Sequence, residues 1–316
     1  MTAAVVWAVV STYRPGPSAV EAIASVRGQV DGVIVVDDGS GEDSTATLDR
    51  LRELGAHVTA SDANVGIAAN LNRGMRIAHA RGASHVLTLD QDSVVPEGFV
   101  AGLREGAEKV VDEWLGAAVP EYFADVRQAT APPDADGLAP AANVIQSGML
   151  IPLRTIQAVG DLREDFFIDL VDTEFELRLR RRGYRVVAVA GLRLGHALGT
   201  KYDRRLFGRP VRVPGIPPEV TLSTPFRYFY RVRNRLVLDR EYFRSAPAQI
   251  VRDTLLDAVH FVNALALARP RRALARIYRA ALFAAVRGRM GPMPAPLRTL
   301  AATVRWDAPL MSEGDR

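Results

Sequence analysis

Short apolar runs alternate with helical patterns along the first hundred residues of the chain. Four apolar, often β-branched runs predict strands, at residues 5–10, 33–36, 57–60 and 85–89. Apolar positions at three- to four-residue spacing predict the helices between them, at residues 18–26, 44–54 and 67–80. Strands that alternate with helices of this length predict an α/β fold with a Rossmann-like, mostly parallel sheet flanked by helices.

Polar residues gather directly after three of these strands. Ser11–Pro17 follows the first strand, Asp37-Asp38-Gly39-Ser40 follows the second, and Asp90-Gln91-Asp92-Ser93 follows the fourth. In open α/β sheets, ligands bind beyond the carboxyl ends of the strands. The recurrence therefore predicts a ligand site at this edge of the sheet.

The pattern changes further along the chain. Residues 120–143 carry a proline pair and several turn residues, and they are predicted to be a loop. A helix is expected from Asp172 to Arg182, stopped by Gly183. From Pro225 onward the chain becomes helical and rich in arginine. These changes predict a sheet-containing domain with two halves and a helical extension, at residues 1–93, 94–224 and 225–316.

Composition excludes several classes of protein. An apolar fraction of 48% in 316 residues matches globular chains and excludes general disorder. The absence of cysteine excludes disulfides, thiolate zinc sites and cysteine nucleophiles. A net charge of +4 does not favour nucleic acid as a partner. Since the start lacks a basic signal-peptide region and no uncharged apolar run approaches ~20 residues, we expect a cytoplasmic protein that does not span a membrane.

Each acidic motif is a weak signal by itself. The segment Asp37-Asp38-Gly39-Ser40 has the composition of an ordinary turn. Asp90 and Asp92 would face the same side of a strand or, in a loop, converge on a divalent cation. Both motifs end strands of one alternating pattern, however, and between them lies Asn64-x-Gly66-x-x-x-Asn70-x-x-x-Gly74. Their co-occurrence indicates a functional site.

In this order, the motifs resemble those of family 2 glycosyltransferases with the GT-A nucleotide-sugar-binding fold. The resemblance continues at Ser147-Gly148, in Phe167-Ile168-Asp169-Leu170-Val171-Asp172-Thr173-Glu174 and at His196-Ala197-Leu198-Gly199. The later segments, together with Asp90-Gln91-Asp92-Ser93, are most similar to bacterial rhamnosyltransferases. The resemblance covers residues 5–200 and implies an inverting, metal-dependent transfer of a sugar from a nucleotide-sugar donor.

The resemblance also implies roles for individual residues. The expected contacts with the nucleotide-sugar are Thr12, Tyr13, Asp37, Asn64, Asn70 and Asp90. The expected ligands of a divalent metal, Mn²⁺ or Mg²⁺, are Asp92 and His196. The expected contacts with the acceptor or the transferred sugar are Ser147, Gly148, Asp169 and Arg233. The chain departs from many relatives at Ala69, where a basic residue is common, and only Arg73 stands nearby to replace it.

Inverting transfer needs a carboxylate that takes the proton from the acceptor hydroxyl. In the resembling family this group precedes an arginine-rich helix, which implies Asp172 here, with Val171 in place of the more frequent glutamate. Asp169 and Glu174 are the alternatives. All three also suit the first turn of a helix, where its dipole favours acidic side chains, and that capping role is compatible with catalysis.

The favoured function is transfer of L-rhamnose from dTDP-rhamnose to a cell-envelope glycan or a lipid-linked acceptor. The same fold would suit another donor, such as UDP-galactofuranose or UDP-glucose, and a non-catalytic nucleotide-sugar-binding scaffold is a further alternative. A nucleotidyltransferase is disfavoured, because Ser11–Pro17 is a poor version of the glycine-rich, basic phosphate loop of such enzymes.

The tail has a charge pattern of its own. Residues 250–291 hold eight arginines and two aspartates. Apolar residues recur there at helical spacing, among them Leu255, Val259, Val262, Leu274, Ile277 and Ala281. Basic amphipathic helices bind anionic membrane surfaces, so we expect peripheral contact with the inner face of the cell membrane. Packing on the catalytic domain, or on a second copy in a homo-oligomer, is the alternative.

Overall fold

The computed structural model describes residues 4–110, 112–195, 200–203, 205–206, 209–210 and 219–307. The chain forms two compact units. The first unit comprises residues 1–167 and 171–197, and the second comprises residues 168–170 and 198–316. The short segment 168–170 therefore clusters with the second unit, although the chain on both sides of it belongs to the first. The boundary that the sequence places at residue 224 stays a prediction.

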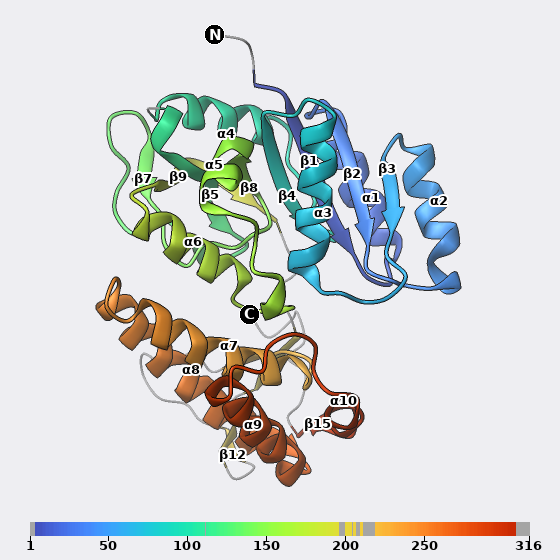
Figure 1. Cartoon of the computed structure of the whole chain (residues 1–316), viewed down its shortest axis with the longest axis vertical. Coiled ribbons are helices and arrows are strands. Elements are labelled where there is room, and N and C mark those ends of the chain that lie inside the picture. Colours follow the sequence, from blue (N-terminus) through green and yellow to red (C-terminus); the bar gives the residue numbers. More distant parts are fainter. Residues whose placement is uncertain are drawn as a thin grey trace. The chain divides into compact units, whose positions relative to one another are not determined.

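The first unit is built on one mostly parallel sheet (Figure 1). The strand order is β3-β2-β1-β4-β8-β5-β9-β7, and β6 pairs with β5. Strands β3, β2, β1 and β4 are parallel, whereas β8 is antiparallel to both of its neighbours. The strands are β1 Val6–Thr12, β2 Gly32–Asp37, β3 His57–Ala60, β4 His85–Asp90, β5 Leu115–Phe123, β6 Val126–Arg127, β7 Leu138–Pro140, β8 Met149–Pro152 and β9 Arg185–Leu194.

Helices flank this sheet, which confirms the predicted fold class. Helix α3 packs against β1 and β2 and lies in front of them in Figure 1. Gly74 permits this approach, because a Cβ there would lie 2.3 Å from Val9 Cγ1. The α-helices are α1 Pro17–Val26, α2 Thr45–Glu53, α3 Ile67–Ala80, α4 Phe99–Glu108, α5 Leu153–Val159 and α6 Val171–Arg181. The 3₁₀ turns are η1 Glu42–Ser44, η2 Asp112–Trp114 and η3 Glu164–Phe166.

The strand register brings the polar motifs to one edge. Thr12 is paired with Asp37 across β1 and β2, and Ser11 is paired with Asp90 across β1 and β4. The apolar residues that precede them are buried in the core, which fixes this register. The polar residues that the sequence predicts at a ligand edge therefore lie together where β1, β2 and β4 end.

The prediction of a loop over residues 120–143 is wrong in part. Strand β5 continues through Pro120 to Phe123, and β6 and β7 also lie within this stretch. The pairing of β5 with β9 shifts its register between Pro120 and Tyr122, at a bulge or irregularity. Proline is tolerated at such places, so pairing with β9 outweighs the local turn signals.

The second unit is helical, as predicted for the tail. Its helices are α7 Arg227–Tyr242, α8 Pro247–Leu267, α9 Arg271–Val286 and α10 Ala295–Ala302. Its short strands are β10 Thr200–Asp203, β11 Arg205–Leu206, β12 Arg209–Pro210, β13 Glu219–Leu222, β14 Ala268–Arg269 and β15 Arg305–Trp306. The ring of Tyr228 stacks on His260 and meets Phe261, Tyr278 and Trp306, so one aromatic cluster joins α7, α8, α9 and β15. Among the described helices, none is both long and apolar enough to cross a membrane.

The two apolar stripes predicted in the tail have different environments. On α9, Leu274, Ile277 and Ala281 are fully buried. On α8, Leu255 and Val262 are 62% and 68% exposed. The stripe of α9 therefore packs within the second unit, against α7, α8 and α10, whereas the predicted face of α8 is exposed among the residues that the structure describes. Packing on the catalytic domain or on a second copy stays an alternative.

Candidate active site

A buried hydrogen-bond network joins the ends of β1 and β2. The Thr12 hydroxyl donates to Asp37 Oδ1 at 3.1 Å, and the Ser40 backbone N–H donates to Asp37 Oδ2 at 2.9 Å. Thr12 and Asp37 are both nearly inaccessible to solvent. Tyr13 follows on the surface, where its ring is exposed and its backbone N–H donates to the Gln91 side chain at 2.8 Å. The two expected nucleotide contacts at these strand ends thus lie together, and Tyr13 lies beside them in the chain.

Asp38 organises the loop before α3, a role that the sequence analysis did not assign. Its carboxylate accepts the backbone N–H groups of Val65 at 2.7 Å and of Gly66 at 3.1 Å. Burial raises the pKa of Asp38, and these two donors act against the increase. Gly66 has a φ of 94°, and a Cβ there would lie 2.5 Å from the Phe167 carbonyl oxygen. Asp38 and Phe167 therefore both restrict the position of the Asn64-x-Gly66 motif.

The two asparagines expected at the nucleotide differ in their surroundings. Asn70 is fully buried, and its Nδ2 donates to Ser11 Oγ at 3.3 Å and to the Val36 carbonyl at 3.4 Å. These contacts tie together the ends of β1 and β2. Asn64 is half-buried, and its Oδ1 has no hydrogen-bond partner in the described structure, although water cannot reach it. Asn64 therefore presents an unsatisfied acceptor, whereas Asn70 supports the strand ends.

The side chain of Arg73 forms hydrogen bonds within the fold. Its guanidinium donates to the Ala60 carbonyl at 2.9 Å and to Thr59 Oγ1 at 2.6 Å. These bonds fasten α3 to the end of β3. The replacement for the basic residue missing at Ala69, suggested from the sequence, is therefore not supported by this geometry.

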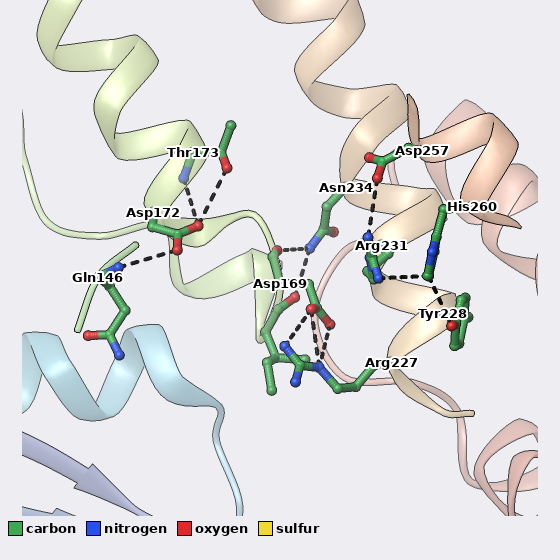
Figure 2. A network of polar contacts seen from close by, with 11 residues as sticks. Gln146, Asp169, Asp172, Thr173, Arg227, Tyr228, Arg231, Asn234, Asp257 and His260 are labelled. Carbon is green, nitrogen blue, oxygen red and sulfur yellow. Dashed lines mark hydrogen bonds and ion pairs between the residues drawn. The ribbon is translucent and has the colours of Figure 1, made fainter. Parts of the chain in front are cut away.

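Gln146 connects the end of β4 with the start of α6, and its contact with Asp172 is drawn in Figure 2. Its side-chain Nε2 donates to Asp90 Oδ1, and its backbone N–H donates to Asp172 Oδ2 at 3.4 Å. Its own Oε1 is buried and has no hydrogen-bond partner among the described residues. Next to it, Ser147 Oγ accepts the backbone N–H of Asp90 at 2.9 Å and lies 2.8 Å from Ser93 Oγ. The expected donor residue Asp90 and the expected base Asp172 are thus linked through one residue, which contacts Asp90 by its side chain and Asp172 by its backbone.

Ser147 and Gly148 form hydrogen bonds with the end of β4. Ser147 is fully buried, and the Gly148 N–H donates to the Thr88 carbonyl at 2.8 Å. Gly148 has a φ of 85°, and a Cβ there would lie 2.8 Å from Leu194 Cδ2. Glycine is thus required both by the backbone conformation and by the space.

The three acidic candidates for the general base occupy different environments. Asp172 is half-buried in the first turn of α6, and it also accepts the Thr173 backbone N–H at 2.8 Å. Glu174 is 3% exposed and paired with Arg178 at 3.0 Å. Asp169 is 8% exposed and paired with Arg227 at 2.7 Å. Glu174 and Asp169 are thus each paired with an arginine, and the assignment of Asp172 as the base stays a prediction.

The expected metal ligands are covered only in part. Asp92 is exposed after the end of β4, two residues beyond Asp90. These carboxylates are the hard oxygen donors that divalent cations prefer, so they fit such an ion. The second expected ligand, His196, lies outside the described residues. In the part of the chain that the structure describes, no group of three or more metal-binding side chains is assembled.

Arg233 is expected from the sequence to contact the acceptor, but its side chain is buried. It is 1% exposed on α7, between the rings of Phe229 and Tyr230. Its guanidinium donates to Asn234 Oδ1 at 3.0 Å and to the Gly291 carbonyl at 2.6 Å. This burial corresponds to a structural role within the second unit.

Asp38 and Gln146 are the site residues that sequence reasoning missed. Asp38 lies within the motif Asp37-Asp38-Gly39-Ser40, but its side chain contacts a loop 27 residues further along the chain. Gln146 directly precedes Ser147-Gly148, and that adjacency was the only signal available.

Taken together, the mostly parallel sheet and its flanking helices have the arrangement of the GT-A fold, and the aspartates stand at the carboxyl ends of its strands, where such sheets bind ligands. Residues 7–135 match the model of the family described as Glycosyl transferase family 2. A dTDP-rhamnosyl transferase of Shigella flexneri, RfbF, is 26% identical over 272 residues, which are 81% of this chain and 86% of that protein. These similarities support a glycosyltransferase: residues 7–135 are similar to family 2, and most of the chain is similar to this rhamnosyltransferase.

Two further comparisons extend these findings. An uncharacterized protein of Mycobacterium tuberculosis is 28% identical over 158 residues, which are 46% of this chain and 58% of that protein. The crystal structure of TarS from S. aureus superposes with a TM-score of 0.51 at 12% identity, and the match covers 79% of this chain. It spans only 42% of the TarS chain, so this likeness concerns the fold alone.

Proposed function

We propose that the protein is an inverting, metal-dependent glycosyltransferase that moves L-rhamnose from dTDP-rhamnose to a cell-envelope glycan or lipid-linked acceptor. The observation that carries the proposed chemistry is the bridge from Asp90 through Gln146 to Asp172. It sets the expected base next to the residue expected to contact the donor. The rhamnose donor is favoured by the 26% identity to a dTDP-rhamnosyl transferase.

In this proposal, the residues at the ends of β1, β2 and β4 bind the nucleotide. Asp37 accepts a hydrogen bond from the base, the half-buried Asn64 lines the same pocket, and Asp90 contacts the ribose. Asp92 and His196 would hold the divalent metal. When bound, the metal stabilises the negative charge that builds on the leaving diphosphate.

Asp172 then acts on the acceptor. Its carboxylate takes the proton of the acceptor hydroxyl as that oxygen bonds to the anomeric carbon. The bond between the anomeric carbon and the diphosphate breaks on the opposite face, which inverts the configuration. The transition state has oxocarbenium character, as in glycoside hydrolysis.

A donor screen tests this proposal. Purified protein with Mn²⁺ or Mg²⁺ is given dTDP-rhamnose, UDP-galactofuranose or UDP-glucose, and release of the nucleoside diphosphate is measured. The proposal expects the fastest release with dTDP-rhamnose. A clear preference for a UDP-sugar would replace the donor, and binding of a nucleotide-sugar without turnover would favour a scaffold.

We also propose that the exposed face of α8 contacts an anionic membrane, where a lipid-linked acceptor would be held. Leu255, Leu256, Val259 and Val262 are each more than 60% exposed on this helix. The adjoining helix α9 carries exposed arginines at positions 272, 276 and 279. An apolar face beside basic side chains has the chemistry that binds anionic lipid surfaces.

A further inference from the structure

The segment before the expected base has an unusual backbone. Phe167, Asp169 and Leu170 have φ values of 68°, 63° and 63°. Residues other than glycine rarely adopt this left-handed region, and they persist there only where surrounding contacts hold them. Only Val171 separates this segment from Asp172 in the chain. The conformation of residues 168–170 therefore sets the direction in which α6 begins.

One buried asparagine holds the backbone of this segment. Asn234 is fully buried on α7, and its Nδ2 donates to the Ile168 carbonyl at 3.0 Å and to the Asp169 carbonyl at 2.9 Å. Its Oδ1 accepts Arg233 Nε at 3.0 Å, which fixes the orientation of the amide. Two successive carbonyls meet one amide group only because the backbone turns sharply at Asp169.

One arginine holds the side chain of the same segment (Figure 2). Arg227 Nε lies 3.1 and 3.2 Å from the two oxygens of Asp169, and its NH2 group lies 2.7 Å from Oδ1. Such a forked pair between a guanidinium and a carboxylate fixes orientation as well as distance. Arg227 and Asn234 are seven residues apart on α7, which is two helical turns, so both side chains leave the same face. We call these two residues, with Asp169, the α7 clamp.

We infer that Arg227 and Asn234 are positioning residues for catalysis, which hold residues 168–170 so that Asp172 points at the acceptor hydroxyl. This inference rests on the proposed function, since it needs Asp172 to be the base. It assigns Asp169 to the clamp rather than to contact with the sugar. A displacement of a reacting group by about 1 Å can lower a rate about 100-fold. Loss of the α7 clamp, which holds the segment before the base, should therefore have a measurable effect on kcat.

The first experiment separates positioning from binding. Arg227→Ala is expected to lower kcat about 10- to 100-fold while the donor KM and the Kd of the free nucleoside diphosphate change by less than about twofold. Arg227→Lys keeps one charged contact with Asp169 but lacks the fork, so it should restore part of kcat. Arg240→Ala, which removes an exposed arginine of the same helix, is the matched control and should leave kcat unchanged.

The second experiment asks whether the clamp acts through Asp172. Asp172→Asn is combined with Arg227→Ala, and the turnover of each variant is compared. If the clamp serves only the base, Arg227→Ala should not lower the small turnover that remains in Asp172→Asn. Asn234→Ala is tested in the same way wherever its thermal midpoint shows that it folds.

Three results would overturn the inference. Near-normal kcat in Arg227→Ala would reject the clamp and leave the proposed function intact. An equal loss in the presence and absence of Asp172→Asn would show a general structural defect instead of positioning. Normal turnover in Asp172→Asn alone would remove the base from the proposed function, and the clamp would then have no catalytic group to position.

Discussion

The side-chain amide of Gln146 donates a hydrogen bond to the carboxylate of Asp90, the last residue of β4. The backbone N–H of Gln146 also donates to Asp172, at the start of α6. One residue thus sets the distance between the expected donor site and the expected base. Its Oε1 is buried and finds no hydrogen-bond partner in the part of the chain that the structure describes.

Replacing Gln146 by glutamate should impair both binding and turnover. The new carboxylate would face Asp90, so like charges would repel where an amide now donates. We expect the donor KM to rise about tenfold, which corresponds to about 1.4 kcal/mol. Steady-state kinetics with the donor varied would check this. Gln157→Glu, at an exposed position on α5, is the matched control. An unchanged KM and kcat would show that the bridge is not used.

Asp172→Asn should retain donor binding and lose turnover, because only the proton acceptor changes. Removal of a general base lowers rates by about 10²- to 10⁴-fold. Calorimetric titration with the nucleoside diphosphate and single-turnover kinetics would separate the two effects. Asp43→Asn, on the exposed turn η1, controls for loss of an acidic group. Near-normal turnover would instead transfer the role to Asp169 or Glu174.

Asp92→Asn should weaken binding of Mn²⁺ in the presence of nucleoside diphosphate by at least about tenfold, since a carboxylate ligand loses its charge. Electron paramagnetic resonance of free Mn²⁺ measures this directly, without reference to activity. An excess of chelator should also abolish sugar transfer. Glu97→Gln, in the same exposed stretch, is the control. If Mn²⁺ affinity were the same in Asp92→Asn, the assignment of Asp92 would be wrong.

The exposed face of α8 should govern binding to vesicles. The triple variant Leu255→Gln, Val259→Gln and Val262→Gln should sediment less with anionic vesicles than the parent chain, and high salt should release the parent chain. Val126→Gln, an exposed apolar residue on β6, is the control. Should the triple variant instead turn a dimer into a monomer, as measured by light scattering, the face would be a contact between two copies.

Stability at high pH should depend on Tyr228. Burial raises the pKa of Tyr228 to about 12, whereas a tyrosine in an unfolded chain titrates near pH ~10. Folding thus favours the neutral form, so the stabilisation is complete below about pH 10 and is lost as the pH rises through about 12. Urea unfolding of the full chain should show a shallower loss of stability above about pH 10 in Tyr228→Phe than in the parent.

The same substitution has a separate cost at neutral pH. Tyr228→Phe loses the contact with His260 Nε2 at 3.1 Å, which should lower the free energy of unfolding by about 0.5–1.5 kcal/mol. Tyr13→Phe, at an exposed ring, should change neither quantity. Parallel pH profiles for Tyr228→Phe and the parent chain would contradict the role given to burial.

The architecture of residues 1–93 follows from patterns that are local in the sequence. Strand β3 and helix α3 have the bounds that the apolar pattern predicts, and the polar motifs stand at the ends of β1, β2 and β4. These features could be predicted because they depend on local periodicity and on a general rule for parallel sheets. The likeness of the motifs to a glycosyltransferase family could be seen for the same reason, since each motif is a contiguous stretch.

The surroundings of each side chain, in contrast, could not be predicted from local patterns. Periodicity gave α8 and α9 similar apolar stripes, but α9 buries its stripe and α8 exposes its own. Arg233 and Asn234 are neighbours in an arginine-rich helix. Arg233 donates to the Gly291 carbonyl, whereas Asn234 donates to the backbone of residues 168–170. Such roles depend on partners about 60 residues away along the chain. Local spacing carries no record of those partners, because packing between distant elements sets them.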